Sequence, residues 1–147
     1  YTTNDAQFET TGWQLEVGSY ATEFEHRTYH DELQRCYRYY QRFDGGAANN
    51  SFGVGNVDGS SQCQIHIQLH TKMRTNVSSM DTTGSAGDYK VRVRSTQNCD
   101  AIPVLAVGGQ DGCFTEWHAN SHGFGDDESV FAISGSTSSY LGFSAEI

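Results

Sequence analysis

The chain has little of several features that common protein classes need. Its 147 residues contain one proline, and no apolar run approaches the roughly 20 residues that span a bilayer. Lysine and arginine number nine against eighteen aspartate and glutamate residues, so the formal net charge is −9. That charge repels nucleic-acid phosphates and anionic lipid headgroups. We therefore expect neither nucleic-acid binding nor membrane insertion.

Cysteine pairs of the kind that hold zinc or carry out thiol exchange are also lacking. Cys36, Cys63, Cys99 and Cys113 are widely spaced and form no C-x-x-C motif, which excludes zinc-ribbon and thioredoxin-type sites. Buried thiols in the core are the favoured interpretation. One disulfide between two of the last three cysteines is the alternative for a protein that works outside a cell.

Glycine, serine and threonine are plentiful, and the apolar residues come in short alternating runs, as in strands joined by turns. The clearest run, SQCQIHIQLH, places Cys63, Ile65, Ile67 and Leu69 on one face. The expected strands cover residues 13–17, 61–70, 88–95, 102–107, 128–134 and 139–147. We predict an all-β fold, an antiparallel β-sandwich of jelly-roll type. The length suits one main domain.

One short helix is expected near the N-terminus. Thr28 followed by Asp31 is typical of a helix start, and Leu33, Cys36, Tyr37 and Tyr40 recur on one helical face. The pattern predicts that the helix ends near residues 43–46, where two glycines can close it.

The longest connection expected between strands, residues 108–128, carries the candidate ligand-binding residues. Aromatic side chains on a long loop often form binding sites. The candidates are Phe114, Trp117, His118 and His122. The alternative is that Phe114 and Trp117 plug the end of the sandwich.

No metal or cofactor site is expected. His118 and His122 have the spacing of helical metal ligands, but Asn120, Ser121 and Gly123 disfavour a helix there. His66 and His70 lie some 13 Å apart on one strand face, by about 3.3 Å per residue, and cannot hold one ion together. Around a three-fold axis each could form a ring, but a solvated polar face explains them better.

Catalytic motifs are lacking as well. There is no Gly-x-Ser-x-Gly elbow, and the Gly53-Val54-Gly55 stretch has no following lysine to bind phosphate. The carboxylates of Glu25, Asp31 and Glu32 are surrounded by basic side chains that neutralise them. We expect no enzyme.

The stretch LEVGSYATEFEHRTYHDELQRCYRYYQ resembles a segment of tail-fibre and other virion-surface proteins of tailed bacteriophages. The resemblance rests on residues 15–22, Phe-Glu-His-Arg at 24–27, Tyr29 and Arg-Tyr-Tyr at 38–40. Met-Arg-Thr-Asn at 73–76 and a C-terminal strand add to the resemblance. The family often has a proline after the Met-Arg pair, whereas this chain continues to Val77 and Ser78 without one. The middle of the chain shows no such resemblance.

The resemblance implies a homotrimer on the virion with other virion proteins as partners. Residues 1–24 would be an incoming strand or connector from an upstream module, and residues 25–147 the β-sandwich head domain. The residues expected at subunit interfaces, or fixing the chain path, are Phe24, Glu25, His26, Arg27, Tyr29, Tyr37, Tyr39 and Tyr40.

The expected function is attachment, as a non-enzymatic fibre head domain that binds a host-surface glycan. One alternative is a head decoration or fibre-anchoring protein without a receptor role. The other is a carbohydrate-binding module of a secreted enzyme, because WQLEVGS also looks like the last strand of such a jelly roll.

Overall fold

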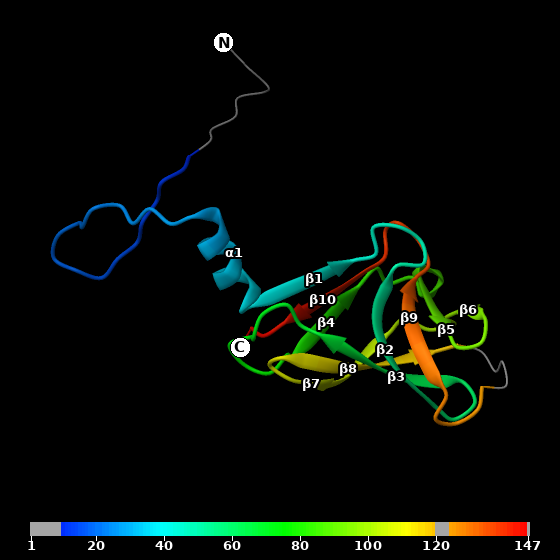
Figure 1. Ribbon diagram of the computed structural model, residues 1–147. Coiled ribbons are helices and arrows are strands. Elements are labelled where there is room, and N and C mark those ends of the chain that lie inside the picture. Colours follow the sequence, from blue (N-terminus) through cyan, green and yellow to red (C-terminus); the bar gives the residue numbers. More distant parts are fainter. Residues whose placement is uncertain (1–9, 120–123, 147) are drawn as a thin grey trace, which may run out of the picture.

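The computed structural model describes residues 10–119 and 124–146, which form one short α-helix and ten strands (Figure 1). The helix is α1 (Tyr29–Tyr37), and a single 3₁₀ turn, η1, spans Ala86–Asp88. The strands are β1 (Tyr40–Asp44), β2 (Ser51–Asp58), β3 (Gln62–Gln68), β4 (Ser79–Thr82), β5 (Tyr89–Arg92), β6 (Thr96–Asn98), β7 (Val104–Gly108), β8 (Gly112–His118), β9 (Ser129–Ser134) and β10 (Tyr140–Ser144).

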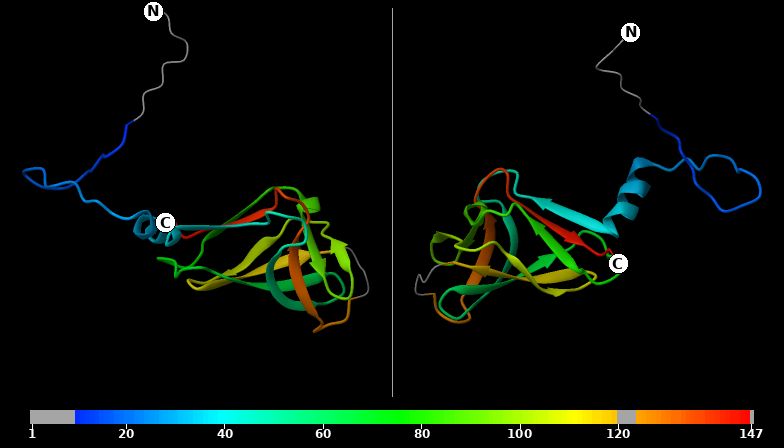
Figure 2. Two further views of the ribbon diagram at one scale, coloured as in Figure 1. Left: turned by 45° about the horizontal axis from the view of Figure 1, so that its top comes forward. Right: turned by 180° about the vertical axis from the view of Figure 1, so that it is seen from behind.

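The strands form two antiparallel sheets, which confirms the expected mostly-β fold with one short helix. The smaller sheet has the order β1-β10-β4, and the larger has the order β6-β5-β9-β2-β3-β8-β7. Both sheets contribute to one apolar core, for example through Phe143 of β10 and Ile65 of β3. Figure 2 shows the two sheets from two further sides. The alternation expected for residues 61–70 is present, with Cys63, Ile65 and Ile67 fully buried.

The helix is shorter than the sequence predicts. Thr28 caps it as expected, because its hydroxyl accepts a hydrogen bond from the backbone N–H of Asp31 at 3.2 Å. The predicted end near residues 43–46 is wrong, since α1 stops at Tyr37 and β1 begins at Tyr40. Residues 40–44 instead pair with β10 at the edge of the smaller sheet, and the side chain of Gln41 is buried there.

Gln41 explains why this strand is held so firmly. Its amide is fully buried and donates to the carbonyl oxygens of Tyr37 (3.0 Å) and Thr71 (2.6 Å), while its oxygen accepts from the backbone N–H of His70 at 2.8 Å. These bonds tie β1 to the chain that leaves β3. A buried amide with every group bonded is stabilising, whereas the same residue in a helix facing water would not be.

Strands β2 and β8 lie where loops were expected. In β2, Gly53 and Gly55 face the adjoining strand β3 so closely that a methyl group on either would overlap a β3 carbonyl oxygen. Glycine there permits close contact between backbones rather than a turn. Strand β8 pairs with β3 over seven residues, from Gln62 opposite His118 to Gln68 opposite Gly112.

Residues 10–28, here called the arm, lie outside both sheets (Figure 1). The strand expected at residues 13–17 is not formed, because these residues take part in neither sheet. The arm continues into α1, and α1 leads into β1 at an edge of the smaller sheet. The domain boundary expected between residues 24 and 25 stays a prediction.

All four cysteines are free thiols, and three are buried in the core. Burial raises the pKa of Cys63 to about 11 and that of Cys99 to about 12, and it also raises the pKa of Cys113. A thiol with a raised pKa is protonated, and therefore unreactive, at mildly alkaline pH.

We expect only the exposed Cys36 to react promptly with an aromatic disulfide reagent at about pH 8 in the native protein. All four thiols should react after unfolding in urea without reductant. A spectrophotometric thiol count under both conditions measures this. Two missing thiols in the unfolded sample would instead indicate a disulfide.

Candidate functional site

The structure separates the residues of the expected loop site. Phe114, Trp117 and His118 belong to strand β8, so their side chains alternate between its two faces. Trp117 is 0% exposed and donates a hydrogen bond from Nε1 to Oγ1 of Thr115 at 2.8 Å. The expectation that Trp117 contacts a ligand is therefore wrong for this structure, because its indole packs in the core. His122 lies outside the described residues.

Phe114 lies on the outer face of the larger sheet, which is the face turned away from the core. It is 46% exposed, and its ring meets that of His66 edge to face at 5.2 Å. His118 lies on the same face near the end of β8 and is partly buried. The structure thus keeps one aromatic residue of the expected site on the surface and adds His66 to it.

A row of residues in register crosses all seven strands of this face. Each member is the direct partner of the next across the backbone ladder, and we call it the cross-strand row. From one edge of the sheet to the other it consists of Thr96, Arg92, Phe131, Val54, His66, Phe114 and Val107.

The four apolar members of the cross-strand row are unusually exposed for strand residues. Val54, Phe131 and Phe114 are each about half exposed, and Val107 is 61% exposed. Side chains that face each other across neighbouring strands are close enough to form a continuous surface. Contiguous exposed apolar surface of this kind is typical of binding sites.

A second row of polar residues runs beside the first, two positions along strands β9, β2, β3 and β8. It consists of Ser129, Asn56, Gln64 and Glu116. In β7 a register shift places Val104, three positions from Val107, at its end. Gln64 donates to a carboxylate oxygen of Asp58 at 2.8 Å. Within the described part of the chain, the side chains of Asn56 and Glu116 form no hydrogen bond, so they are available to a ligand.

The charges around this face are arranged unevenly. Arg92 stands next to Phe131 in the cross-strand row, and Glu116 stands toward the β7 end of the polar row. Just after β5, Arg94 is paired with Glu128. The hydrogen bond that Arg94 donates holds the pKa of the Glu128 carboxyl below the usual range. Glu128 is therefore occupied by Arg94, whereas no salt bridge of the described residues involves Arg92.

The residues expected at subunit interfaces fall into two groups. Phe24, Glu25, His26 and Arg27 are contiguous at the end of the arm, where Arg27 pairs with Glu25 and, at 3.0 Å, with Glu32 of α1. The hydrogen bonds that Arg27 donates to Glu25 and then to Glu32 raise its pKa. These ion pairs fix how the arm enters the helix.

The tyrosines of the second group are spread over three environments. Tyr29 is largely exposed at the start of α1, and Tyr37 lies beside His70, with 6.2 Å between ring centroids. Tyr39 and Tyr40 lie after α1, not on it, so the expectation that Tyr40 belongs to the helical face is wrong. The guanidinium of Arg74 lies 5.1 Å from the Tyr39 ring, and burial raises the pKa of Tyr40.

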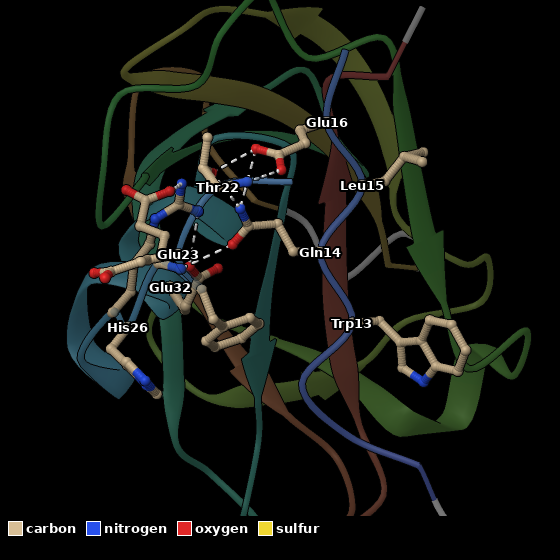
Figure 3. A pocket seen from close by; sticks show the side chains of 11 residues that line it. Trp13, Gln14, Leu15, Glu16, Thr22, Glu23, His26 and Glu32 are labelled. Atoms are coloured by element: carbon tan, nitrogen blue, oxygen red, sulfur yellow. Dashed lines mark hydrogen bonds and ion pairs between the residues drawn. The ribbon is translucent and has the colours of Figure 1, made fainter. Parts of the chain in front are cut away.

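The arm itself folds back into an open loop with a hollow on its polar side (Figure 3). Glu16 accepts hydrogen bonds from the hydroxyl and backbone N–H of Thr22, both at 2.6 Å, and Gln14 accepts from the N–H of Glu25 at 2.8 Å. The bonds from Thr22 lower the pKa of Glu16. Trp13 and Leu15 point to the opposite side (Figure 3).

No motif in the sequence marked the outer face, because three of its central residues lie in segments for which the sequence predicts no binding site. Val54 and Asn56 belong to the glycine-rich stretch expected to be a loop, and Phe131 was expected only as part of a strand. In β9, Phe131 and Ile133 alternate with Val130 and Ala132. This run of four apolar residues was the one available sign that β9 has apolar side chains on both faces.

Comparisons with known proteins found no match. No protein-family model, no curated protein and no solved structure is significantly similar to this chain. Among the residues that the structure describes, no group of three histidine, cysteine, aspartate or glutamate side chains is placed to hold a metal ion. In the same residues no helix has the length and apolar character needed to cross a membrane.

Proposed function

We propose that this chain is a non-enzymatic head domain of a tailed-phage fibre or virion-surface protein that attaches the particle to a host-surface glycan. The glycan would bind on the outer face of the larger sheet rather than on the loop expected from the sequence. Under this proposal the fold is a β-sandwich of jelly-roll type, for which the two antiparallel sheets are the supporting observation. The chain would work as a homotrimer, together with other virion proteins, and without nucleic acid or membrane insertion.

The observation that supports glycan binding is the pair of parallel rows on the outer face. One row offers exposed Phe131, Val54 and Phe114, and the other offers Asn56 and Glu116 with free polar atoms. A sugar ring has an apolar face of C–H groups and a rim of hydroxyls. Aromatic side chains pack against the former, and amides and carboxylates bond the latter. The two rows provide both at once.

The size of the face fits an oligosaccharide better than a single sugar. Phe131 and Phe114 are separated by three strand spacings, because β2 and β3 lie between β9 and β8. At about 4.8 Å per spacing, the two rings are roughly 14 Å apart. A chain of several sugar rings lying across the strands would contact both.

Replacing Phe114 and Phe131 together with alanine is expected to weaken glycan binding by about 10- to 100-fold, since each aromatic contact contributes about 0.5–1.5 kcal/mol beyond buried area. The wild-type chain would first be screened on an array of bacterial surface oligosaccharides. Titration calorimetry with the strongest binder would then compare the variants.

Ile102→Ala is the matched control, because Ile102 is an exposed apolar residue beside β7 but outside both rows. It should bind as the wild type does. Failure of the wild-type chain to bind any oligosaccharide, or an unaffected double variant, would count against the proposal.

A fibre-anchoring or head decoration role without a receptor is the second candidate, and the arm favours it. Its apolar side chains Trp13, Leu15 and Val17 are largely exposed, as expected of a segment that binds another virion subunit. A carbohydrate-binding module of a secreted enzyme would use the same outer face. Mass spectrometry of purified phage particles separates these roles, since only the virion proteins would be found there.

A further inference from the structure

We propose that residues 13–17 of one copy of this chain add as an edge strand to β7 of a second copy. This interaction goes beyond glycan attachment and does not depend on it. It explains why a segment with the sequence pattern of a strand has no strand partner within its own chain. Addition of an extended segment to a free sheet edge is a common mode of recognition.

The donor segment has the features of a strand that lacks only its neighbour. Trp13, Leu15 and Val17 alternate with polar residues and are 82%, 102% and 108% exposed. Figure 3 shows Trp13 and Leu15 on one side of the chain, with Gln14 and Glu16 on the other. In the described part of the chain, no backbone N–H or carbonyl of residues 13–17 forms a hydrogen bond.

The arm is also held in shape before it meets a partner. Gln14 and Glu16 are bonded to the returning segment at Glu25 and Thr22, so the polar side of the strand is occupied within the arm. The apolar side is left facing outward. A segment ordered in advance loses less conformational freedom on binding, and so binds more tightly.

The acceptor is the edge of the larger sheet formed by β7, which has the same length as the donor, five residues. Val104 and Val107 on its outer face are 45% and 61% exposed. Apart from the ladder to β8, no described residue forms a backbone hydrogen bond with residues 104–107. An exposed apolar edge of this kind is a template for pairing.

The other three sheet edges are poorer acceptors. Strand β6 has three residues, Thr96–Asn98, all polar. Strand β1 carries the Arg42–Asp44 ion pair, and β4 carries the exposed Asp81. Charged side chains on edge strands oppose pairing with another chain. Among the edges of the described sheets, β7 is therefore the one suited to an apolar strand.

The geometry favours docking between copies over docking within one chain. The arm leaves the β-domain at β1, and β1 and β4 are the opposite edges of the smaller sheet. Strand β7 lies on the side of β4, where the N–H of Val77 bonds the carbonyl of Gly109 just after β7. In Figure 1 the arm extends away from the β-domain on the α1 side.

Because donor and acceptor are different surfaces, each copy gives one arm and receives another. Such head-to-tail contacts close into rings when the rotation between copies permits. A ring of three would match the trimer in the proposed function, and it would add an eighth strand to each larger sheet beside Val107.

Light scattering on the full chain at low micromolar concentration tests the proposal. The wild type is expected to form a closed oligomer, and Leu15→Lys and Val107→Lys are each expected to give monomers. Asn98→Lys is the matched control, since it places the same charge on β6 at the opposite edge of the same sheet. It should keep the wild-type mass.

A mixing experiment identifies the two surfaces as partners. Leu15→Lys chains retain an intact β7, and Val107→Lys chains retain an intact arm, so an equimolar mixture should form a heterodimer of twice the monomer mass. A monomeric wild type, single variants that keep the oligomer, or a mixture that stays monomeric would overturn the proposal. Retained glycan binding by the monomeric Leu15→Lys variant, whose substitution lies on the arm and outside the outer face, would leave the attachment function standing independently.

Discussion

Replacing Trp117 with alanine is expected to lower the free energy of unfolding by about 3–5 kcal/mol. The side chain is fully buried, and its ring meets that of Tyr89 edge to face at 5.5 Å and lies 6.1 Å from that of Phe52. Alanine would leave a cavity between the two sheets. It would also remove the donor to Oγ1 of Thr115, which is itself buried.

Urea denaturation followed by fluorescence or circular dichroism measures this change. Phe114→Ala is the matched control, because it removes an aromatic ring from the outer face of the same strand. It should change stability by less than about 1 kcal/mol, as surface substitutions usually do. If the Trp117→Ala protein had normal stability but failed to bind a ligand, that result would support the loop site expected from the sequence.

Replacing Gly55 with alanine is expected to cost about 3 kcal/mol, at the upper end for an added core methyl group. The new methyl would overlap the carbonyl oxygen of Gln64 in the adjoining strand. That oxygen belongs to the backbone of β3, which is paired on its other side with β8. Neither β2 nor β3 can move away from the other without breaking hydrogen bonds of the ladder, so the backbone would be strained by the added methyl group.

Gly87→Ala provides the comparison for Gly55→Ala. The only neighbour its methyl would meet within 4 Å is the hydroxyl of Ser85, at 4.0 Å, so it should change stability by no more than about 0.5 kcal/mol. The difference between the two urea midpoints, at equal slopes, gives the cost of the close contact. Equal midpoints for the two variants would mean that β2 and β3 are not packed as described here.

The Trp117→Ala and Gly55→Ala variants together test whether the outer face is positioned by the core beneath it. Phe114 and Val54 of the cross-strand row lie on the strands that contain Trp117 and Gly55. Loss of either core contact should lower the stability of the sheet. Glycan affinity measured well below the unfolding transition should then fall less than it does for the double variant of Phe114 and Phe131.

Much of the β-domain was predictable because its strands alternate clearly. The expected strands at 61–70, 88–95, 102–107, 128–134 and 139–147 correspond to β3, β5, β7, β9 and β10. The helix start at Thr28 was also predictable, since capping depends on neighbouring residues alone. The helix end was not, because β1 is stabilised by β10, about a hundred residues away in the chain.

The candidate site was much less predictable than the fold. Trp117 was expected on a loop because the glycines and polar residues around it have the composition of one. Pairing with β3 makes the segment a strand, and the two-residue period then sends Trp117 into the core and Phe114 outward. One change of local structure therefore moved Trp117 into the core and left Phe114 exposed.

The sequence by itself determined the fold class, the capped helix start, the burial of the Cys63, Ile65 and Ile67 face, and the acidic charge of the chain. These follow from periodicity and composition, which are local properties. Only the tertiary structure decided that seven residues from seven strands form one row, and that residues 13–17 stay unpaired. Register between distant strands, and the lack of a neighbour, depend on contacts that no short stretch of sequence contains.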